Sequence, residues 1–357
     1  MTPTPPSPDE PEVIKLRGPG DTIGSVPYLL GFHPTDSVVV IATDPVTRHM
    51  VAAARMDLPE PGYEDAVATR LAGALAGRSP LVLILVIIAP AGALPDPASP
   101  TSRDSVDLPR QAFVDQIEAM FSALGCAVEQ ALWAAASTAG AAWRDYHDPR
   151  HAGAVPDLTI SPVAAHSVLA GLVTYANREE MAALFAPDHD DVLARRAMLL
   201  AACKTGGTGH RADRYRRYHG VERAVREARQ GRLPTRDEDI IRLAVALGDH
   251  WIRDACLRHT HSEFSVAAEQ LWLHLVRAIP GPDRAEPAVL LAVTSYLRGD
   301  TVASGMALNC ALTANPRHRL GMLMTDVVEC GMPPARLRRA VGQMVVQALD
   351  QIMESSP

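Results

Sequence analysis

The spacing of apolar residues changes near residue 137, and this change constrains the fold more than any other feature. Before it, β-branched or wholly apolar runs alternate with helical patterns, and after it the apolar residues recur every three to four positions. Period-two and fully apolar runs are typical of strands, whereas three-to-four spacing is typical of helices. The sequence therefore predicts an α/β unit followed by an all-α helical unit.

Strands are predicted at residues 37–43, 49–57, 81–89 and 126–136, with helices at 63–76 and 110–124. The short DPVTR link between the first two strands favours an antiparallel hairpin. The helices between the later strands favour crossovers that lay helices on a mixed sheet of four or more strands. The run LVLILVIIA at 81–89 is apolar on both faces, as in a central strand, and a bilayer span needs about 20 residues.

Three predicted divisions follow. Residues 1–12 (MTPTPPSPDEPE) are rich in Pro, Ser and acids, which predicts a disordered tail and not a signal peptide. Residues 13–158 form the α/β unit, in which the turn-rich stretch 140–158 is a linker, and residues 159–357 form the helical unit. The five cysteines show no paired spacing, so we expect reduced thiols and a cytoplasmic protein.

The helical unit is predicted to hold helices at 163–175, 178–185, 192–204, 221–230, 236–259, 265–279, 287–297, 302–314, 320–330 and 334–353. Residues 288–316 resemble one tetratricopeptide repeat, with a glycine in the turn and a closing Asn-Pro pair. Because one repeat cannot bury its own face and no second copy is evident, we expect a helical hairpin inside a larger helical unit.

The motifs of common enzymes are missing from the sequence, which contains no GxSxG, HExxH or GxGxxG. The sequence identifies no catalytic residues. It does not decide whether the protein is an enzyme, because a catalytic site can assemble from residues that are distant in sequence. No cofactor and no metal are expected. The HTHSE stretch, with His259, His261 and Glu263, is read as surface residues because positions two apart on a helix diverge. The glycine-rich stretch 204–210 is read as a helix end and loop.

A basic stretch runs from Arg211 to Arg236 and holds nine arginines, with tyrosines between them. Such residues neutralise phosphates and stack on bases, so the stretch is a candidate for binding nucleic acid or another polyanion. The candidates are Arg211, Arg214, Arg216 and Arg217. The alternative is an ordinary solvated helix face, because Glu222 and Glu227 interrupt the arginines. The formal charge of −7 gives no global attraction to nucleic acid or to an anionic membrane.

Residues 27–37 (PYLLGFHPTDS) run directly into VVV, and RMDLP follows at 55–59. This pattern resembles an actinobacterial family known as domain of unknown function 4192. The resemblance extends through Trp143 and Arg144 towards the C-terminus. The family often carries Cys-Cys-Pro after that Trp-Arg pair, where this chain has HDPRHAGAVP. The resemblance implies no assigned reaction.

The motif makes sense as the entry to a strand, with Leu29, Leu30 and Phe32 packed under the sheet and Gly31 in a turn. A functional alternative uses the strand ends, where open α/β sheets bind ligands. Its candidate residues are His33, Asp36, Arg55, Asp57, Trp143 and Arg144. Arg55 and Arg144 would hold an anionic ligand or nucleotide, although Asp57 lies on the same strand face as Arg55 and is able to pair with it.

Taken together, the sequence favours a non-catalytic protein-interaction or assembly module, with a protein partner or a second copy of the chain. The first alternative is an enzyme or sensor that binds a small anion at the strand ends. The second alternative is nucleic-acid binding through the basic stretch.

Overall fold

The computed structural model describes residues 16–75, 81–90, 108–169, 173–206, 211–330 and 332–354. The predicted tail 1–12 and residues 207–210 of the glycine-rich stretch lie outside these ranges. The chain divides into two compact units, one that extends to Thr174 and one that begins at Tyr175 and continues to the C-terminus. An α/β unit therefore precedes an all-α unit, as the apolar spacing predicts.

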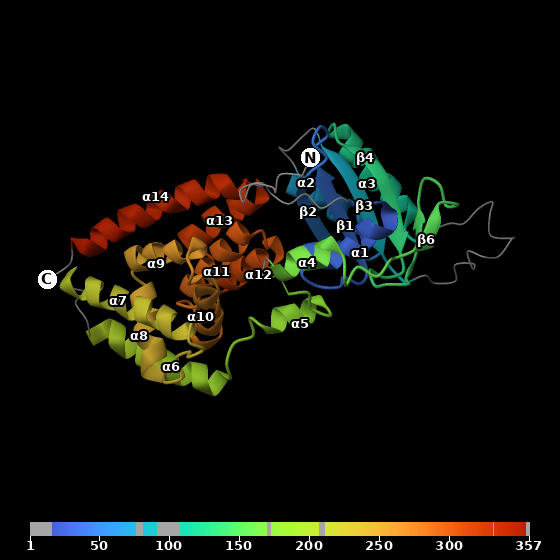
Figure 1. Cartoon of the computed structure of the whole chain (residues 1–357). Coiled ribbons are helices and arrows are strands. Elements are labelled where there is room, and N and C mark those ends of the chain that lie inside the picture. Colours follow the sequence, from blue (N-terminus) through green and yellow to red (C-terminus); the bar gives the residue numbers. More distant parts are fainter. Residues whose placement is uncertain are drawn as a thin grey trace. The chain divides into compact units, whose positions relative to one another are not determined.

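A six-stranded mixed sheet forms the centre of the first unit (Figure 1). Its strands are β1 (Ser37–Thr43), β2 (Met50–Asp57), β3 (Val82–Ile88), β4 (Ala127–Ala134), β5 (Ala142–Asp145) and β6 (Ala152–Ala154), in the spatial order β2-β1-β3-β4-β5-β6. β3 and β4 run parallel, and the other neighbouring pairs are antiparallel. The predicted hairpin of β1 and β2 and the predicted mixed sheet are confirmed.

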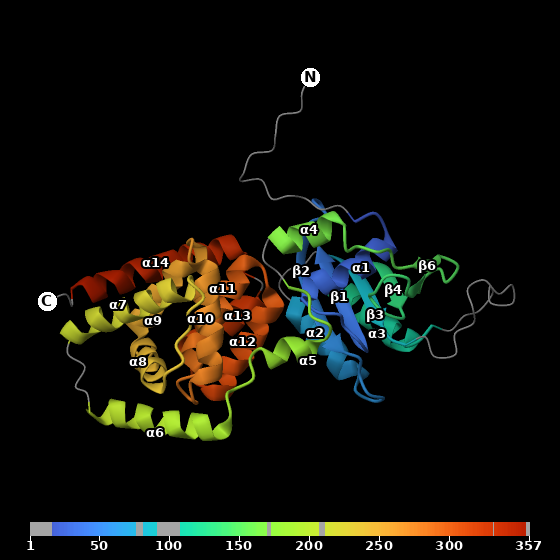
Figure 2. The same ribbon diagram turned by 60° about the horizontal axis from the view of Figure 1, so that its bottom comes forward.

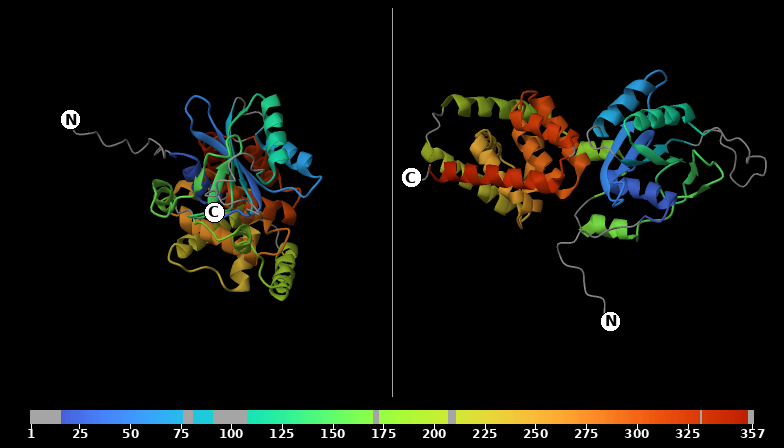
Figure 3. Two further views of the ribbon diagram at one scale, coloured as in Figure 1. Left: turned by 90° about the vertical axis from the view of Figure 1, so that its right-hand side faces the viewer. Right: turned by 90° about the horizontal axis from the view of Figure 1, so that it is seen from above.

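Helices cover both faces of this sheet, with α1 (Pro19–Leu30) and α4 (Pro162–Leu169) on one face and α2 (Glu64–Leu75) and α3 (Gln111–Ala123) on the other (Figure 3). The central strands β1 and β3 are buried along most of their length. Burial on both faces explains why SVVVIAT and LVLILVIIA are apolar without alternation.

Helix α1 is not predicted by the sequence, which suggests a turn-rich entry at this place. Pro27 and the glycines within it argue against a helix, yet Gly31 ends the helix at φ 75° and donates to the Pro27 carbonyl at 2.8 Å. A Cβ at Gly24 would lie 2.9 Å from Leu158 Cδ1. The glycine therefore lets α1 lie close to the chain that follows β6.

The predicted linker at 140–158 is wrong, because this stretch contributes β5 and β6 to the sheet. These strands have four and three residues, too few for an alternating pattern to show. Gly153 on β6 packs against the ring of Trp143 on β5. Tertiary packing, and not local pattern, therefore defines this edge of the sheet.

The regular elements in the described residues of the second unit are all helices. Its elements are α5 (Arg178–Ala183), α6 (Asp190–Gly206), α7 (Arg211–Ala228), α8 (Asp237–Leu247), α9 (His250–Cys256), the 3₁₀ helix η2 (Leu257–His261), α10 (Ser265–Ala278), α11 (Ala285–Arg298), α12 (Thr301–Ala314), α13 (Arg319–Glu329) and α14 (Pro334–Met353). The predicted helix at 236–259 is divided, because Asp249 caps α9 by accepting from the Trp251 amide.

The core of the helical unit centres on α11, which is buried almost from end to end. Leu271, Trp272 and Leu275 of α10 pack with it in the same apolar cluster. Gly299, at φ 94°, turns the chain from α11 into α12. The two helices form the predicted helical hairpin. Their resemblance to a tetratricopeptide repeat stays a prediction.

Candidate functional site

Several of the residues that the sequence predicts at strand ends lie at one end of the sheet, where the strands β3 and β4 terminate. The pairing register places Asp57 and Ile88 beside Ser37, and Ala134 beside Ile88, so the carboxyl ends of the parallel strands lie at this end. His33 reaches the same end of the sheet, where its Nδ1 lies 3.4 Å from Ser137 Oγ. Burial lowers the pKa of His33 below its usual 6.5, which favours the neutral ring at pH 7.

The side chain of Arg55 is occupied by groups of the protein. Its Nε donates to Ser37 Oγ at 2.9 Å, and its Nη2 lies 2.6 Å from Asp57 Oδ1. The guanidinium lies 5.8 Å from the centroid of the Phe32 ring, and 12% of the side chain is exposed. The pairing of Arg55 with Asp57 is the structural alternative that the sequence offers. An anion at this end of the sheet would have to displace Asp57, which is 77% exposed.

Asp36 serves the backbone turn before β1. Its φ is 41°, in the left-handed region where Asp is tolerated better than most residues. Its main-chain carbonyl accepts from the Leu58 amide at 2.8 Å, which ties the start of β1 to the end of β2. This contact gives the backbone at position 36 a structural role and does not involve the Asp36 carboxylate.

Arg144 lies on the opposite face of the sheet from Arg55. The pairing register leads from Arg55 across β1, β3 and β4 to Asp145 on β5. Because neighbours along a strand point to opposite faces, Arg144 points away from the side that Arg55 occupies. Its Nη1 donates to the Pro149 carbonyl at 3.2 Å, and the residue is buried. The two arginines therefore do not converge on one ligand.

Trp143 shares the face of Arg55 but has a packing role. The same register relates it through Ala134 and Ile88 to Ser37. Its ring makes an edge contact with His151 at 5.1 Å between centroids, and Gly153 lies against it. Trp143 is 7% exposed, so it offers no stacking platform.

A hollow of about 480 Å³ lies where α2 and α3 begin, and the sequence gives no sign of it. Its lining includes Glu64, Asp65 and Arg110. Glu64 accepts from the Gly62 amide at 2.7 Å, and Asp65 accepts from Gln116. The volume suits a small ligand. Two carboxylates beside a single arginine oppose an anion there, so the hollow does not support the anionic-ligand alternative.

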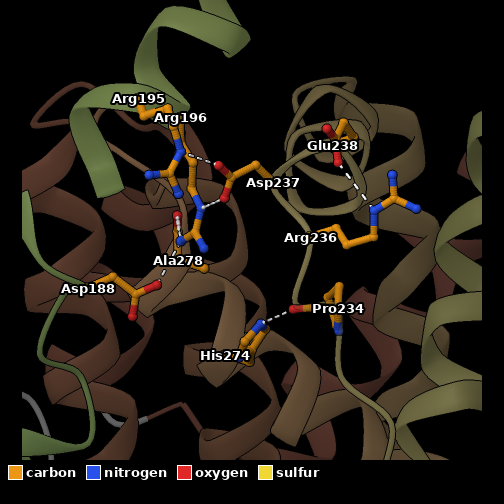
Figure 4. A network of polar contacts seen from close by, with 9 residues as sticks. All are labelled: Asp188, Arg195, Arg196, Pro234, Arg236, Asp237, Glu238, His274 and Ala278. Carbon is orange, nitrogen blue, oxygen red and sulfur yellow. Dashed lines mark hydrogen bonds and ion pairs between the residues drawn. The ribbon is translucent and has the colours of Figure 1, made fainter. Parts of the chain in front are cut away.

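A buried ion-pair network attaches α6 to the rest of the helical unit (Figure 4). Arg196 donates to Asp237 Oδ1 at 2.8 Å, to Asp188 Oδ2 at 2.7 Å and to the Ala278 carbonyl at 3.0 Å. Arg195 donates to Asp237 Oδ2 at 2.5 Å. Hydrogen bonds from Arg195 and Arg196 lower the pKa of Asp237 to about 2. The side chain of Arg196 is 7% exposed, so this contact is largely sealed from water.

The outward surface of α6 is apolar. Met198 is 75% exposed and Leu199 is 39% exposed, while Leu200 is buried and Val192 and Leu193 are half-buried. The exposed face also includes Ala194, Ala197, Ala201 and Ala202. α6 lies along the outside of the helical unit beside α8 (Figure 2). We call Ala194, Ala197, Met198, Leu199, Ala201 and Ala202 the α6 face; the exposed Arg195 lies among them and pairs with Asp237.

The histidines of HTHSE point to separate partners. His259 Nε2 lies 2.8 Å from Glu222 Oε1, and His261 Nε2 accepts from Arg338 Nε at 2.8 Å. Glu263 pairs with Arg229. In the part of the chain that the structure describes, no three His, Cys, Asp or Glu side chains gather as a metal site would require.

Of the four arginines predicted to bind a polyanion, Arg214, Arg216 and Arg217 fall into different environments. Arg214 donates to Asp249 Oδ2 at 2.7 Å, and Arg217 lies 3.2 Å from Asp213 Oδ2, so both serve contacts within the unit. Arg216 is 76% exposed and lies 3.6 Å from Asp213 Oδ1. Arg211 begins α7. The structure therefore separates the stretch into inward and outward arginines, which the sequence does not distinguish.

The fold defines a two-unit protein in which a helix-covered mixed sheet precedes a helical unit. The family model described as domain of unknown function (DUF4192) matches residues 19–335, and the chain belongs to this family. No curated protein and no solved structure matches the chain. None of the helices in the described ranges has the length and apolar character to cross a bilayer.

Proposed function

We propose that this protein is a non-catalytic protein-interaction module and that the α6 face contacts its partner. The observation that carries the proposal is a helix of 17 residues whose apolar side chains are mostly exposed. In proteins, most helix stability comes from burying an apolar face against the rest of the molecule. α6 departs from this pattern, because ion pairs through Arg196 and the buried Leu200 attach it, while most of its apolar residues are exposed.

The exposed residues are suited to a protein contact. Methionine is flexible and polarisable, and it is common on surfaces that accommodate a partner. Alanines at neighbouring positions allow a second helix to approach closely. Exposed apolar surface of this kind marks interaction sites in proteins. The α/β unit gives indirect support, because the alternative of anion binding needs Arg55, and that side chain already contacts Ser37 and Asp57.

The test is site-specific photo-crosslinking of the full chain in its host cell. A photoreactive amino acid at position 198 is expected to give discrete crosslinked adducts. The matched control is position 266 on α10, where Val266 is 64% exposed, similar to Met198 in exposure but distant from the α6 face in sequence. Position 266 is expected to give none of these adducts.

A double variant, Met198→Glu with Leu199→Glu, provides the second arm. Both residues are exposed, so the variant is expected to fold normally, with unchanged circular dichroism and melting temperature. It should lose the partner that the native chain captures. Equal capture by both chains, or the same adducts at positions 198 and 266, would contradict the proposal.

A further inference from the structure

The outward face of α7 carries a stripe of basic side chains that the interaction proposal does not use. Arg216, His219, Arg223 and Arg226 are exposed. Their spacing of three or four residues places them on one side of the helix. Over ten residues the stripe extends for about 15 Å along the helix. We call these four residues the α7 stripe, and α7 is drawn in Figure 1.

The charges of this stripe are largely uncompensated. The side chains of Arg223 and Arg226 make no hydrogen bond or ion pair with any residue that the structure describes, and the exposed Glu227 directly follows Arg226 in the sequence. Arg216 has the loose contact with Asp213 at 3.6 Å. The inward arginines of the same helix behave differently, since Arg214 is tied to Asp249 at 2.7 Å. The outward charges are therefore available to an anion from outside.

A hollow of about 350 Å³ lies within the stripe, lined by Tyr215, Arg216, His219, Gly220 and Arg223. Gly220 lies in the middle of α7, where glycine is the poorest helix former after proline. A Cβ at this position would meet nothing within 4 Å, so no packing contact requires the glycine. Its bare backbone leaves room on the helix surface between two arginines.

Aromatic rings border the same hollow. The rings of Tyr215 and His219 lie 4.3 Å apart between centroids at 62°. Arginine binds phosphate oxygens through its planar fork, and aromatic rings stack on bases. The hollow is open along one helix and does not enclose a ligand as small-molecule sites do. A line of repeated cations beside rings fits a chain of phosphates and bases better than a single small anion.

We infer that the α7 stripe binds single-stranded nucleic acid, with Arg216, Arg223 and Arg226 on phosphates and a base in the hollow at Gly220. This inference uses a different helix and different observations from the proposal for the α6 face. An experiment that contradicts one of the two proposals therefore leaves the other unaffected. Because the whole chain has a formal charge of −7, attraction is local to the stripe.

The experiment measures fluorescence anisotropy of a labelled 20-nucleotide oligothymidine with the full chain at 50–200 mM NaCl. Three phosphate contacts to a single strand predict a slope of about −2 for log K against log salt. Affinity should therefore fall about 20-fold between 50 and 200 mM salt. The double variant Arg223→Gln with Arg226→Gln should reduce the slope to about −0.7.

Two further variants separate this surface from general basicity. Gly220→Leu fills the hollow and should weaken binding about fivefold or more, with the salt slope unchanged. Arg236→Gln removes a charge from the same basic stretch outside α7, where the side chain is 73% exposed, and should leave affinity within about twofold. Unchanged circular dichroism would show that each variant folds.

Three results would overturn the inference. The first is no binding of the oligonucleotide at 50 mM NaCl. The second is equal loss of affinity in Arg236→Gln and in the double variant. The third is binding of a 20-residue polyglutamate as tight as that of the oligonucleotide, with Gly220→Leu unaffected, because an acidic protein segment would then be the ligand.

Discussion

Replacing Asp237 by asparagine should loosen α6 without disturbing the core of the helical unit. The carboxylate accepts from Arg195 and Arg196, which lower its pKa from 3.8 to about 2. One pKa unit corresponds to about 1.4 kcal/mol, so the lowering corresponds to roughly 2.5 kcal/mol. Arg195 is 56% exposed, and water and salt weaken its share. We therefore expect Asp237→Asn to lower the stability of the α6 attachment by about 1–2 kcal/mol at pH 7.

The pH dependence follows from the direction of the pKa change. A carboxyl whose pKa is lowered by folding stabilises the folded state above its unfolded pKa, and this contribution disappears as the pH falls through the folded pKa. The contribution of Asp237 should thus be complete above about pH 5 and roughly half remaining near pH 3. The asparagine variant lacks it at every pH, so the two proteins should converge in stability as the pH approaches 2.

Hydrogen exchange read by mass spectrometry is the suitable assay, because it reports the opening of α6 separately from the rest of the chain. Peptides from α6 should exchange about 5–30-fold faster in Asp237→Asn at pH 7, while those from α11 keep their rates. The matched control is Asp239→Asn, which removes another acid from the first turn of α8, where it pairs with the exposed Arg242. Its effect on α6 should be below about 0.5 kcal/mol. Unchanged exchange of α6 in Asp237→Asn, or an equal effect of Asp239→Asn, would refute the reasoning.

Three further predictions test other parts of the structure. Gly220→Ala should stabilise α7 by about 0.5–1 kcal/mol in urea unfolding, because the Cβ meets nothing and alanine is the better helix former; destabilisation would show that the space is already filled. Gly153→Ala should destabilise the α/β unit by about 1–3 kcal/mol, because its Cβ would lie 3.0 Å from the rigid Trp143 ring, and an unchanged urea midpoint would contradict the packing. His318→Ala should cost about 1–2 kcal/mol, because the buried imidazole accepts from an amide at the start of α13 and contacts Glu286 at 3.1 Å. His318→Asn should recover part of that loss in thermal unfolding by restoring the cap, and identical melting of the two variants would argue against capping.

The parts of the fold that the sequence predicts are those where burial is uniform along a segment. SVVVIAT forms β1 at the predicted residues, and LVLILVIIA contains β3, because covered strands need no polar positions. Helix α1 is missed because Pro27 and two glycines lower its local propensity, while close packing against Leu158 favours it. The strands β5 and β6 are missed because segments so short carry no period.

The candidate residues show the same division between local and long-range information. The pair of Arg55 and Asp57 is predictable, since positions two apart on a strand share a face, and the structure has it. The separation of Arg55 from Arg144 depends on the register across several strands, which no local pattern encodes. The direction of Arg214 on α7 likewise depends on a residue distant in sequence, Asp249, which pairs with it at 2.7 Å.

The way α6 is attached has a thermodynamic consequence. Among the described residues of α6, Leu200 is the one apolar side chain that is buried. Most of the other contacts that attach the helix are the ion pairs of Arg196. Heat capacity rises on unfolding chiefly when apolar surface meets water. Detachment of α6 would expose mainly Leu200 and the half-buried Val192 and Leu193, so the accompanying rise in heat capacity would be small. Reversible detachment of α6 would therefore give little calorimetric signal, while the apolar core around α11 stays folded.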